Sequence, residues 1–180
     1  MEKFRKTLVI IGSMLLLTTA SCAVQNKKEN KIRNLSLEES YEKNLTNSIL
    51  MTGWYYISDI DSGFARQLDR TDEFYTINPF PIVTAEDVTM LSIEKDNWGG
   101  VFLSMRFGKE GTERWRVATG RSIGKKLAFI VNDKLLYVPQ VHSEITAGVS
   151  ALSRIDYSKE DYERAKQAIE NNKKEMQRTE

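Results

Sequence analysis

The chain contains very few of the residues that stabilise or activate many small proteins. Its 180 residues include one cysteine, one histidine and three prolines. A single cysteine cannot form a disulfide within the chain, and one histidine with one cysteine cannot supply the nitrogen and sulfur ligands of a usual zinc site. The formal net charge is +1, which gives no excess of basic residues for nucleic acid. The composition therefore argues against a disulfide scaffold, a zinc centre and a nucleic-acid-binding protein.

The first 21 residues have the pattern of an export signal. Three basic residues precede the apolar run LVIIGSMLLL, and small residues lead up to a cysteine. The stretch Thr19-Ala20-Ser21-Cys22 resembles the cleavage and lipidation site of bacterial lipoproteins, although Thr19 stands where leucine is usual. The resemblance implies that Cys22 becomes the acylated first residue of the mature chain. The alternatives are an uncleaved membrane anchor and a secretory signal that leaves a free thiol.

The residues after the signal are expected to form a tether and one folded domain. Removal of residues 1–21 takes away three positive charges and one negative charge, which changes the net charge from +1 to −1. Residues 22–35 are polar and lack periodicity, so they predict a flexible tether; the alternative is a basic strip that contacts anionic headgroups. The longest later apolar run, Leu127–Val131, is far shorter than the ~20 residues of a membrane-spanning helix.

Hydrophobic periodicity predicts an α+β domain. A capping signal at Ser36 predicts a helix that reaches about Met51. A second capping signal at Ser158 predicts a helix that frays beyond Asn171. A further helix is expected at residues 112–121, and one helical turn at residues 84–87. The predicted strands are residues 54–57, 73–77, 88–96, 101–107, 127–131, 135–138 and 149–155. Asn78-Pro79 and Pro81 are expected to end the second strand, because proline has no N–H for the ladder.

The stretch LAFIVNDKLLYVP predicts a buried hairpin. Leu127–Val131 carries apolar residues on both faces of a strand, which favours a central position covered on both sides. Asn132 and Asp133 tolerate positive φ and suit the tip, and Pro139 ends the ladder. The polar strip from Gln140 to Thr146 is expected to be a surface loop that returns the chain to the sheet.

The order of motifs from Gly100 to Ile169 resembles a known family. An alternating strand, FLSMRF, leads through KEG to a helix; the hairpin GKKLAFIVNDKLLYVP, the turn ITAG and the helix YSKEDYERAKQAI follow, with PIVTAEDV before them. This order is similar to the periplasmic head of the SecD/SecDF protein-export subunits. The resemblance implies an α+β fold and contact with polypeptides. The family's usual Gly-Gly is Ala147-Gly148 here, and the chain has none of the charged transmembrane helices on which the family's proton-coupled work depends.

Two kinds of candidate site remain. The aromatic residues of the N-terminal part predict a groove for an extended peptide or a hydrophobic ligand, and the same residues are equally typical of a core: Trp54, Tyr55, Tyr56, Phe74 and Tyr75. A histidine-based catalytic site would have to use His142. Its neighbours Ser143 and Glu144 point to opposite faces of an extended segment and do not form a triad. The sequence therefore predicts no catalytic residues, no metal site and no cofactor.

The sequence as a whole predicts a membrane-anchored lipoprotein of the cell envelope that is not an enzyme. Its expected parts are the signal (1–21), acylated Cys22 with the tether (22–35), a helix with aromatic-rich strands (36–82), and a SecD-head-like α+β domain with a charged last helix (83–180). The expected fold is an antiparallel sheet with helices packed mainly on one face. The expected partners are unfolded or extended polypeptides or another envelope protein, and the bilayer, with no nucleic acid. The alternatives are a structural envelope component and a carboxylate-dependent hydrolase. Ala23, after the cysteine, favours outer-membrane over inner-membrane retention if the cell is Gram-negative.

Overall fold

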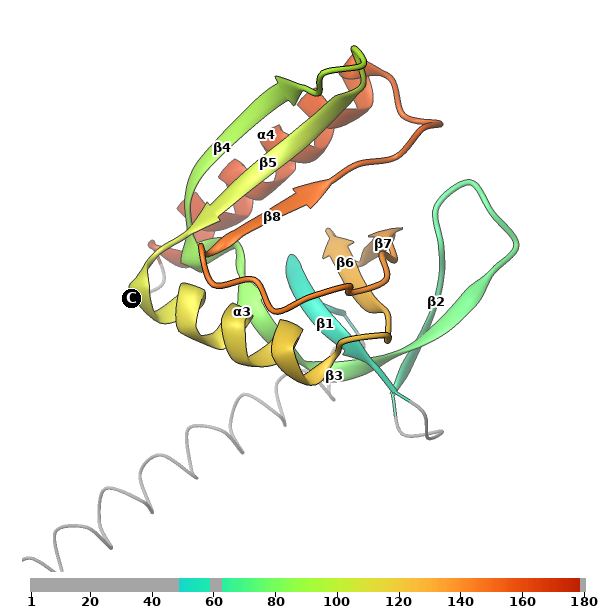
Figure 1. Ribbon diagram of the computed structural model, residues 1–180, viewed down its shortest axis with the longest axis vertical. Coiled ribbons are helices and arrows are strands. Elements are labelled where there is room, and N and C mark those ends of the chain that lie inside the picture. The colour runs from blue at the N-terminus through green and yellow to red at the C-terminus, as the bar shows by residue number, and fades with distance from the viewer. Residues whose placement is uncertain (1–48, 59–62, 179–180) are drawn as a thin grey trace, which may run out of the picture. The chain divides into compact units, whose positions relative to one another are not determined.

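The computed structural model describes residues 49–58 and 63–178, which form two antiparallel sheets and two helices (Figure 1). The strands are β1 (Gly53–Ile57), β2 (Phe64–Gln67), β3 (Phe74–Thr84), β4 (Val88–Lys95), β5 (Val101–Phe107), β6 (Leu127–Val131), β7 (Lys134–Tyr137) and β8 (Val149–Leu152). The helices are α3 (Lys109–Arg121) and α4 (Lys159–Met176), with a single 3-10 turn η1 (Ala85–Asp87). The predicted signal, Cys22, the tether and most of the predicted helix 36–51 lie outside the described residues.

The larger sheet closes on itself. Its strand order is β2-β3-β1-β6-β7, and the two outer strands meet where the Asp69 N–H donates to the Leu135 carbonyl at 2.9 Å. Leu68 and Leu135 form a parallel bridge at the same place. Beside this seam the Arg66 guanidinium binds the Asp133 carboxylate at 2.6 Å. The five strands therefore form a small barrel without a free edge along this seam.

The smaller sheet is open. Its order is β4-β5-β8, so β5 is central and β4 and β8 are edges. Helix α4 lies behind this sheet in Figure 1 and buries Tyr162, Ala165 and Ile169. The opposite face carries Met90, Phe102, Ser104 and Val149, all of them at least partly exposed. One face of this sheet is thus packed, and the other is uncovered by helix or strand in the described part of the chain.

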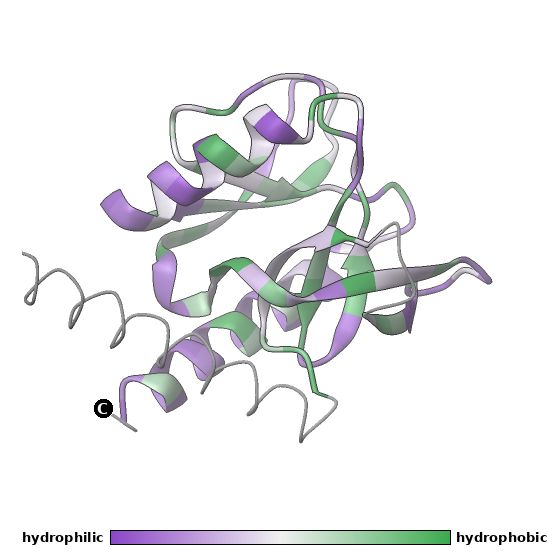
Figure 2. Ribbon diagram, turned by 90° about the horizontal axis from the view of Figure 1, so that it is seen from below, coloured by the Kyte–Doolittle hydropathy of each residue, from purple (hydrophilic) through white to green (hydrophobic). Residues whose placement is uncertain are grey.

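Two hydrophobic clusters hold the fold. The cluster inside the barrel contains Tyr55, Ile77, Ile130 and Leu135. The larger cluster joins the outer face of the barrel to the small sheet and both helices, with Trp54, Phe129, Trp115 and Tyr162 among its members. Strand β6 belongs to both, because Ala128 and Ile130 point into the barrel while Leu127, Phe129 and Val131 point into the larger cluster. Figure 2 shows the result on the helices, which are mainly hydrophilic with isolated hydrophobic turns.

A charged cluster around Tyr157 joins the β2–β3 turn to the start of α4. Arg70 donates to the Asp161 carboxylate at 2.5 Å, and its guanidinium lies 4.7 Å from the Tyr157 ring centroid. Arg154 lies at the same distance from that ring. The Tyr157 hydroxyl donates to Asp69 at 2.7 Å. The Tyr157 ring therefore contacts two cations. Asp69 and Arg70 of the barrel turn and Asp161 of α4 fix the position of the turn relative to the helix.

The structure confirms the α+β fold class, the LAFIV strand buried on both faces and the Asn132-Asp133 tip, whose φ angles are 49° and 66°. The capping box at Ser158 is also present. The structure adds that the strands divide between two sheets. It also places β1 and β3 in one sheet with β6 and β7, so residues before and after position 82 share a barrel.

Three local predictions are wrong, and one strand was missed. The strand expected to stop before Asn78-Pro79 continues through both prolines to Thr84, because a register shift opposite Tyr55–Ile57 absorbs the missing donors. Helix α4 does not fray at Asn171 and continues to Met176. Ile49 to Met51 are not helical. Strand β2 was not expected, since four residues with partial burial carry little periodic signal.

Candidate functional site

An apolar cavity of about 250 Å³ lies beside edge strand β8. Its walls come from three parts of the fold: Trp54 and Leu127 of the barrel, Trp115 and Thr119 of α3, and Ser150 and Ala151 of β8. The segment from Tyr137 to Ile145 supplies the rest of the lining. Most of the lining is aromatic or aliphatic, so the cavity suits apolar groups.

The two tryptophans are fixed by hydrogen bonds to β8. The Trp54 indole N–H donates to the Ser150 hydroxyl at 3.1 Å, and the Trp115 indole N–H donates to the Val149 carbonyl at 2.9 Å. The ring centroids lie 5.0 Å apart. Because both indole donors are used within the protein, the tryptophans offer the cavity apolar surface and no free N–H. They also hold the edge strand in place.

The segment after β7 closes the other side of the cavity. Backbone hydrogen bonds of 2.8 Å join Val141 to Gly124 and Lys125, and the Ile145 N–H donates to the Thr119 hydroxyl at 2.9 Å. Val141 is buried, whereas His142 and Ser143 are exposed. The segment is a mainly exposed loop, as predicted, but Val141 and Ile145 point inward and the backbone is attached near the end of α3.

Two polar groups near the cavity are the Tyr137 hydroxyl and the Glu144 carboxylate. Burial raises the pKa of the Tyr137 hydroxyl, with a further contribution from Tyr162. The Glu144 carboxylate forms a surface ion pair with the Arg116 guanidinium, with an N–O distance of 2.7 Å. In residues 49–58 and 63–178, no three histidine, cysteine, aspartate or glutamate side chains gather as a metal site would require. What the cavity can do is accept an apolar side chain.

The structure does not bring the five predicted groove residues together. Along β1, Trp54 and Tyr56 face the larger cluster while Tyr55 points into the barrel, where its hydroxyl donates to the Met51 carbonyl at 2.8 Å. Phe74 is 67% exposed at the start of β3. Only Trp54 lines the apolar cavity. Tyr56 and Tyr75 line a different, more basic hollow with Arg121, Lys125 and Lys126.

The sequence indicated some of these residues as core, but it did not indicate most of the cavity. Burial of Tyr55, together with the nearby charge of Asp133, raises the pKa of its hydroxyl, as expected for a core residue. The cavity residues that the sequence did not indicate are Trp115, Tyr137 and Val141. Trp115 lies in the segment that was expected to be a helix, but nothing in its spacing showed that β8 would leave space beside it. That space arises from tertiary contacts alone.

No helix within residues 49–58 and 63–178 is long and apolar enough to cross a bilayer. In the comparison with known families, residues 62–160, more than half of the chain, match the family described as SecDF, P1 head subdomain.

Curated relatives match just under half of the chain. The protein translocase subunit SecD of Acidaminococcus fermentans is 24% identical over 88 residues, which is 49% of this chain and 21% of the relative. The subunit SecD of Rhodothermus marinus is 28% identical over 78 residues, 43% of this chain and 12% of the relative. The chain thus spans about a fifth or less of the length of these relatives.

A solved structure agrees on the fold. The crystal structure of SecDF in a super-membrane-facing form covers 73% of this chain and 20% of that chain, with a TM-score of 0.51 and 16% sequence identity. At this identity the likeness concerns the arrangement of strands and helices. It matches the antiparallel sheets and the two helices described above.

Proposed function

Because the chain belongs to the SecDF P1 head subdomain family, we propose that it is a non-enzymatic binding module for unfolded or extended polypeptides in protein export. The relatives in which this subdomain occurs are protein translocase subunits. This chain covers only a small part of them. A head subdomain that is not coupled to a proton gradient can still contribute to protein export by binding a polypeptide passively.

The apolar cavity beside β8 is the observation that supports this proposal most directly. Its volume of about 250 Å³ is below the roughly 300–1,000 Å³ that is usual for small-molecule sites. It therefore suits one or a few apolar side chains better than a whole cofactor. An extended segment that runs along the β8 edge would place alternate side chains at the cavity mouth. Such binding is weak and tolerant of sequence, because backbone contacts and one pocket supply the affinity.

The proposal is tested by titration of a fluorescently labelled unfolded protein with the purified full-length chain. We expect saturable binding without ATP or metal. Ala151→Phe should weaken it at least about ten-fold, because Ala151 lines the cavity and a larger side chain would fill it. Ser92→Phe is the matched control, since Ser92 is half-buried on the same face of the sheet but does not line the cavity.

Two outcomes would overturn the proposal. Absence of binding at high micromolar concentration would favour a structural component of the envelope. Turnover of a substrate that is lost in His142→Ala would favour an enzyme. We expect His142→Ala to bind as the unchanged chain does, because His142 is exposed at the rim of the cavity.

We further propose that the module is held at the envelope membrane by acylation of Cys22. The support for this is the sequence before Cys22, which has the basic, apolar and small-residue regions of a lipoprotein signal. Cys22→Ser should abolish labelling by a radioactive fatty acid and prevent cleavage after residue 21. Labelling that persists in Cys22→Ser would contradict the anchor without bearing on polypeptide binding.

A further inference from the structure

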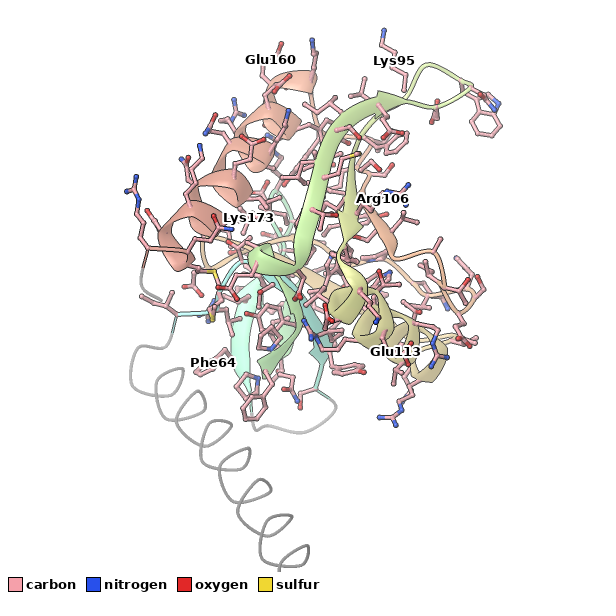
Figure 3. All side chains as sticks on the ribbon, turned by 90° about the vertical axis from the view of Figure 1, so that its left-hand side faces the viewer. Phe64, Lys95, Arg106, Glu113, Glu160 and Lys173 are labelled. Carbon is pink, nitrogen blue, oxygen red and sulfur yellow. The ribbon has the colours of Figure 1, made fainter. Side chains whose placement is uncertain are left out.

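Strand β4 presents an open edge on the side of the molecule opposite to β8. It pairs with β5 on one side, and no strand in residues 49–58 or 63–178 pairs with its other side. Figure 3 looks onto this edge: β4 runs across the front of the molecule, Lys95 projects at its end, and Lys173 lies near its beginning. An uncovered edge of this kind is a template for a further strand.

The register shows which backbone groups face outward. The Asp96 N–H donates to the Gly100 carbonyl at 2.8 Å, so in the antiparallel ladder the next residue pair to be bonded is Glu94 with Phe102, then Ser92 with Ser104. Residues between them turn their N–H and C=O groups away from β5. The free edge therefore offers the backbone groups of Leu91, Ile93 and Lys95.

The other side of β5 leads to the same assignment. The Phe107 N–H donates to the Gly148 carbonyl at 2.9 Å, which means that Phe107, Met105 and Leu103 direct their backbone groups to β8. The intervening residues Phe102 and Ser104 must then bond to β4. Two independent hydrogen bonds thus place the same three residues at the open edge.

The side chains around this edge define what it would accept. Leu91 and Ile93 are half-buried and pack against the larger cluster on the α4 side, whereas Lys95 is exposed. At the other end the Lys173 ammonium group donates to the Val88 carbonyl, and a bulge lies between Val88 and Met90. The usable edge is therefore short, with apolar neighbours at two positions and a cation at the third.

We propose that the β4 edge binds one short extended segment of another polypeptide as an added antiparallel strand. The bound segment has apolar residues opposite Leu91 and Ile93 and an acidic residue opposite Lys95. Side chains directly opposite each other in a sheet interact, so this pattern matches the edge position by position. The site lies on the far edge of the sheet from the β8 cavity and does not depend on the function proposed for that cavity.

A second copy of the chain fits this edge less well. Antiparallel self-pairing centred on Ile93 places Lys95 opposite Leu91, and pairing centred on Ser92 places Lys95 opposite Thr89. Pairing centred on Glu94 places two glutamates opposite each other, which is unfavourable. None of these registers gives Lys95 an acidic partner, so the edge matches a different sequence better than its own.

The test uses the full-length chain and the capped peptide acetyl-Asp-Thr-Val-Thr-Val-amide. Amide hydrogen exchange is followed residue by residue by NMR. In the free chain we expect fast exchange at Leu91, Ile93 and Lys95 and slow exchange at Ser92 and Glu94. Peptide at ten times its dissociation constant should slow the first three amides about ten-fold and leave Ser92 and Glu94 unchanged.

Three controls make the result specific. The reversed peptide, acetyl-Val-Thr-Val-Thr-Asp-amide, should bind more weakly because its acid no longer meets Lys95 in the antiparallel direction. Lys95→Glu should weaken the original peptide about five-fold and favour a peptide with lysine in place of aspartate. Ala151→Phe, which fills the other site, should leave all of these values unchanged.

Three results would overturn the inference. Unchanged exchange at Leu91 and Ile93 with saturating peptide would show that no strand is added. Slow exchange at these amides without peptide, rising with protein concentration, would show that a second copy occupies the edge. Loss of peptide binding in Ala151→Phe together with full binding in Lys95→Glu would place the peptide in the β8 cavity instead.

Discussion

The two sheets of this protein treat their edges in opposite ways. In the barrel the outer strands β2 and β7 meet at the Asp69–Leu135 hydrogen bond, and Arg66 binds Asp133 across the seam. In the small sheet both outer strands are left without a strand partner within the described residues, and one face is uncovered. The barrel has no free strand edge at this seam, whereas the open sheet has backbone groups at its β4 edge and an apolar cavity beside β8.

This difference indicates a division of labour along the chain. The barrel and the larger hydrophobic cluster provide stability, since they contain the fully buried aromatic residues. The open sheet, held from behind by α4, borders both of the proposed binding sites. Substitutions in the barrel should therefore change folding, and substitutions at the edges of the open sheet should change binding with little effect on folding. The following predictions test that contrast.

The largest effect is expected from Phe129→Asp. Phe129 is 2% exposed and its ring lies 4.8 Å from that of Trp54. A carboxylate there would be buried without a partner, at a cost of at least about 4 kcal/mol. Denaturant unfolding should show loss of the cooperative transition, whereas Phe129→Leu should cost only about 1–2 kcal/mol. An unchanged unfolding midpoint for Phe129→Asp would mean that β6 is not the shared central strand.

A smaller loss is expected when the barrel seam is opened. Arg66→Ala removes a guanidinium that donates to both the carboxylate and the carbonyl of Asp133. We expect a decrease of about 1–2 kcal/mol in the free energy of unfolding, because these partly buried hydrogen bonds involve charged groups. Arg66→Lys should recover only part of it, since lysine cannot bond in the same forked geometry. A full recovery would show that charge alone closes the barrel.

Acid should weaken the link between the barrel turn and α4. The hydrogen bond from Arg70, and then that from the Ser158 N–H, holds the pKa of the Asp161 carboxyl well below its usual range. Because the folded state favours the charged form, this stabilisation is complete above the ordinary aspartate pKa of about 3.9 and declines as the pH falls below it. Melting temperatures of the unchanged chain and Asp161→Asn should thus differ most near pH 7 and converge toward pH 2. A constant difference over this range would contradict the assignment.

The smallest effect on stability is expected at the tip of the open sheet. Trp98 is 90% exposed, and its backbone N–H donates to the Asp96 carboxylate at 2.9 Å, so Asp96 holds the turn and the indole does not. Trp98→Phe should change the free energy of unfolding by less than about 0.5 kcal/mol. Trp54 and Trp115 are buried, so the substitution should also remove the red-shifted part of the tryptophan fluorescence. A loss above about 1 kcal/mol would show that the tip is packed.

The sequence was most informative where a pattern is local. The run LAFIV is apolar at every position, and it is the strand that both clusters share. Ser158 and Asp161 carry the capping signal in four consecutive residues, and the helix begins there. Closure of the barrel has no such signal, because it depends on a contact between Leu68 and Leu135, which are far apart in sequence.

The candidate groove shows a second limit. In GWYYI both faces of the strand are covered, so the aromatic residues give no alternation from which an exposed face could be inferred. The prolines of β3 show a third limit of sequence-based prediction, because they were expected to end the strand. A bulge in which the Phe80 N–H donates to the Asn78 side chain lets the strand continue. The sequence suggested polypeptide binding by resemblance, but it could not show that the open space lies beside β8.

Gly148, the residue that begins the return into β8, has a consequence for how this family can diverge. Its φ is +62°, and a Cβ atom there would lie 2.0 Å from the Thr112 hydroxyl oxygen. A smaller residue at 112 would relieve the contact but not the strained dihedral angle. Ala147 beside it is exposed and carries neither restriction. Of the two glycines usual at this turn, the first can therefore be substituted while the second cannot. An alignment of relatives should show alanine, serine or other small residues at position 147 and glycine at position 148.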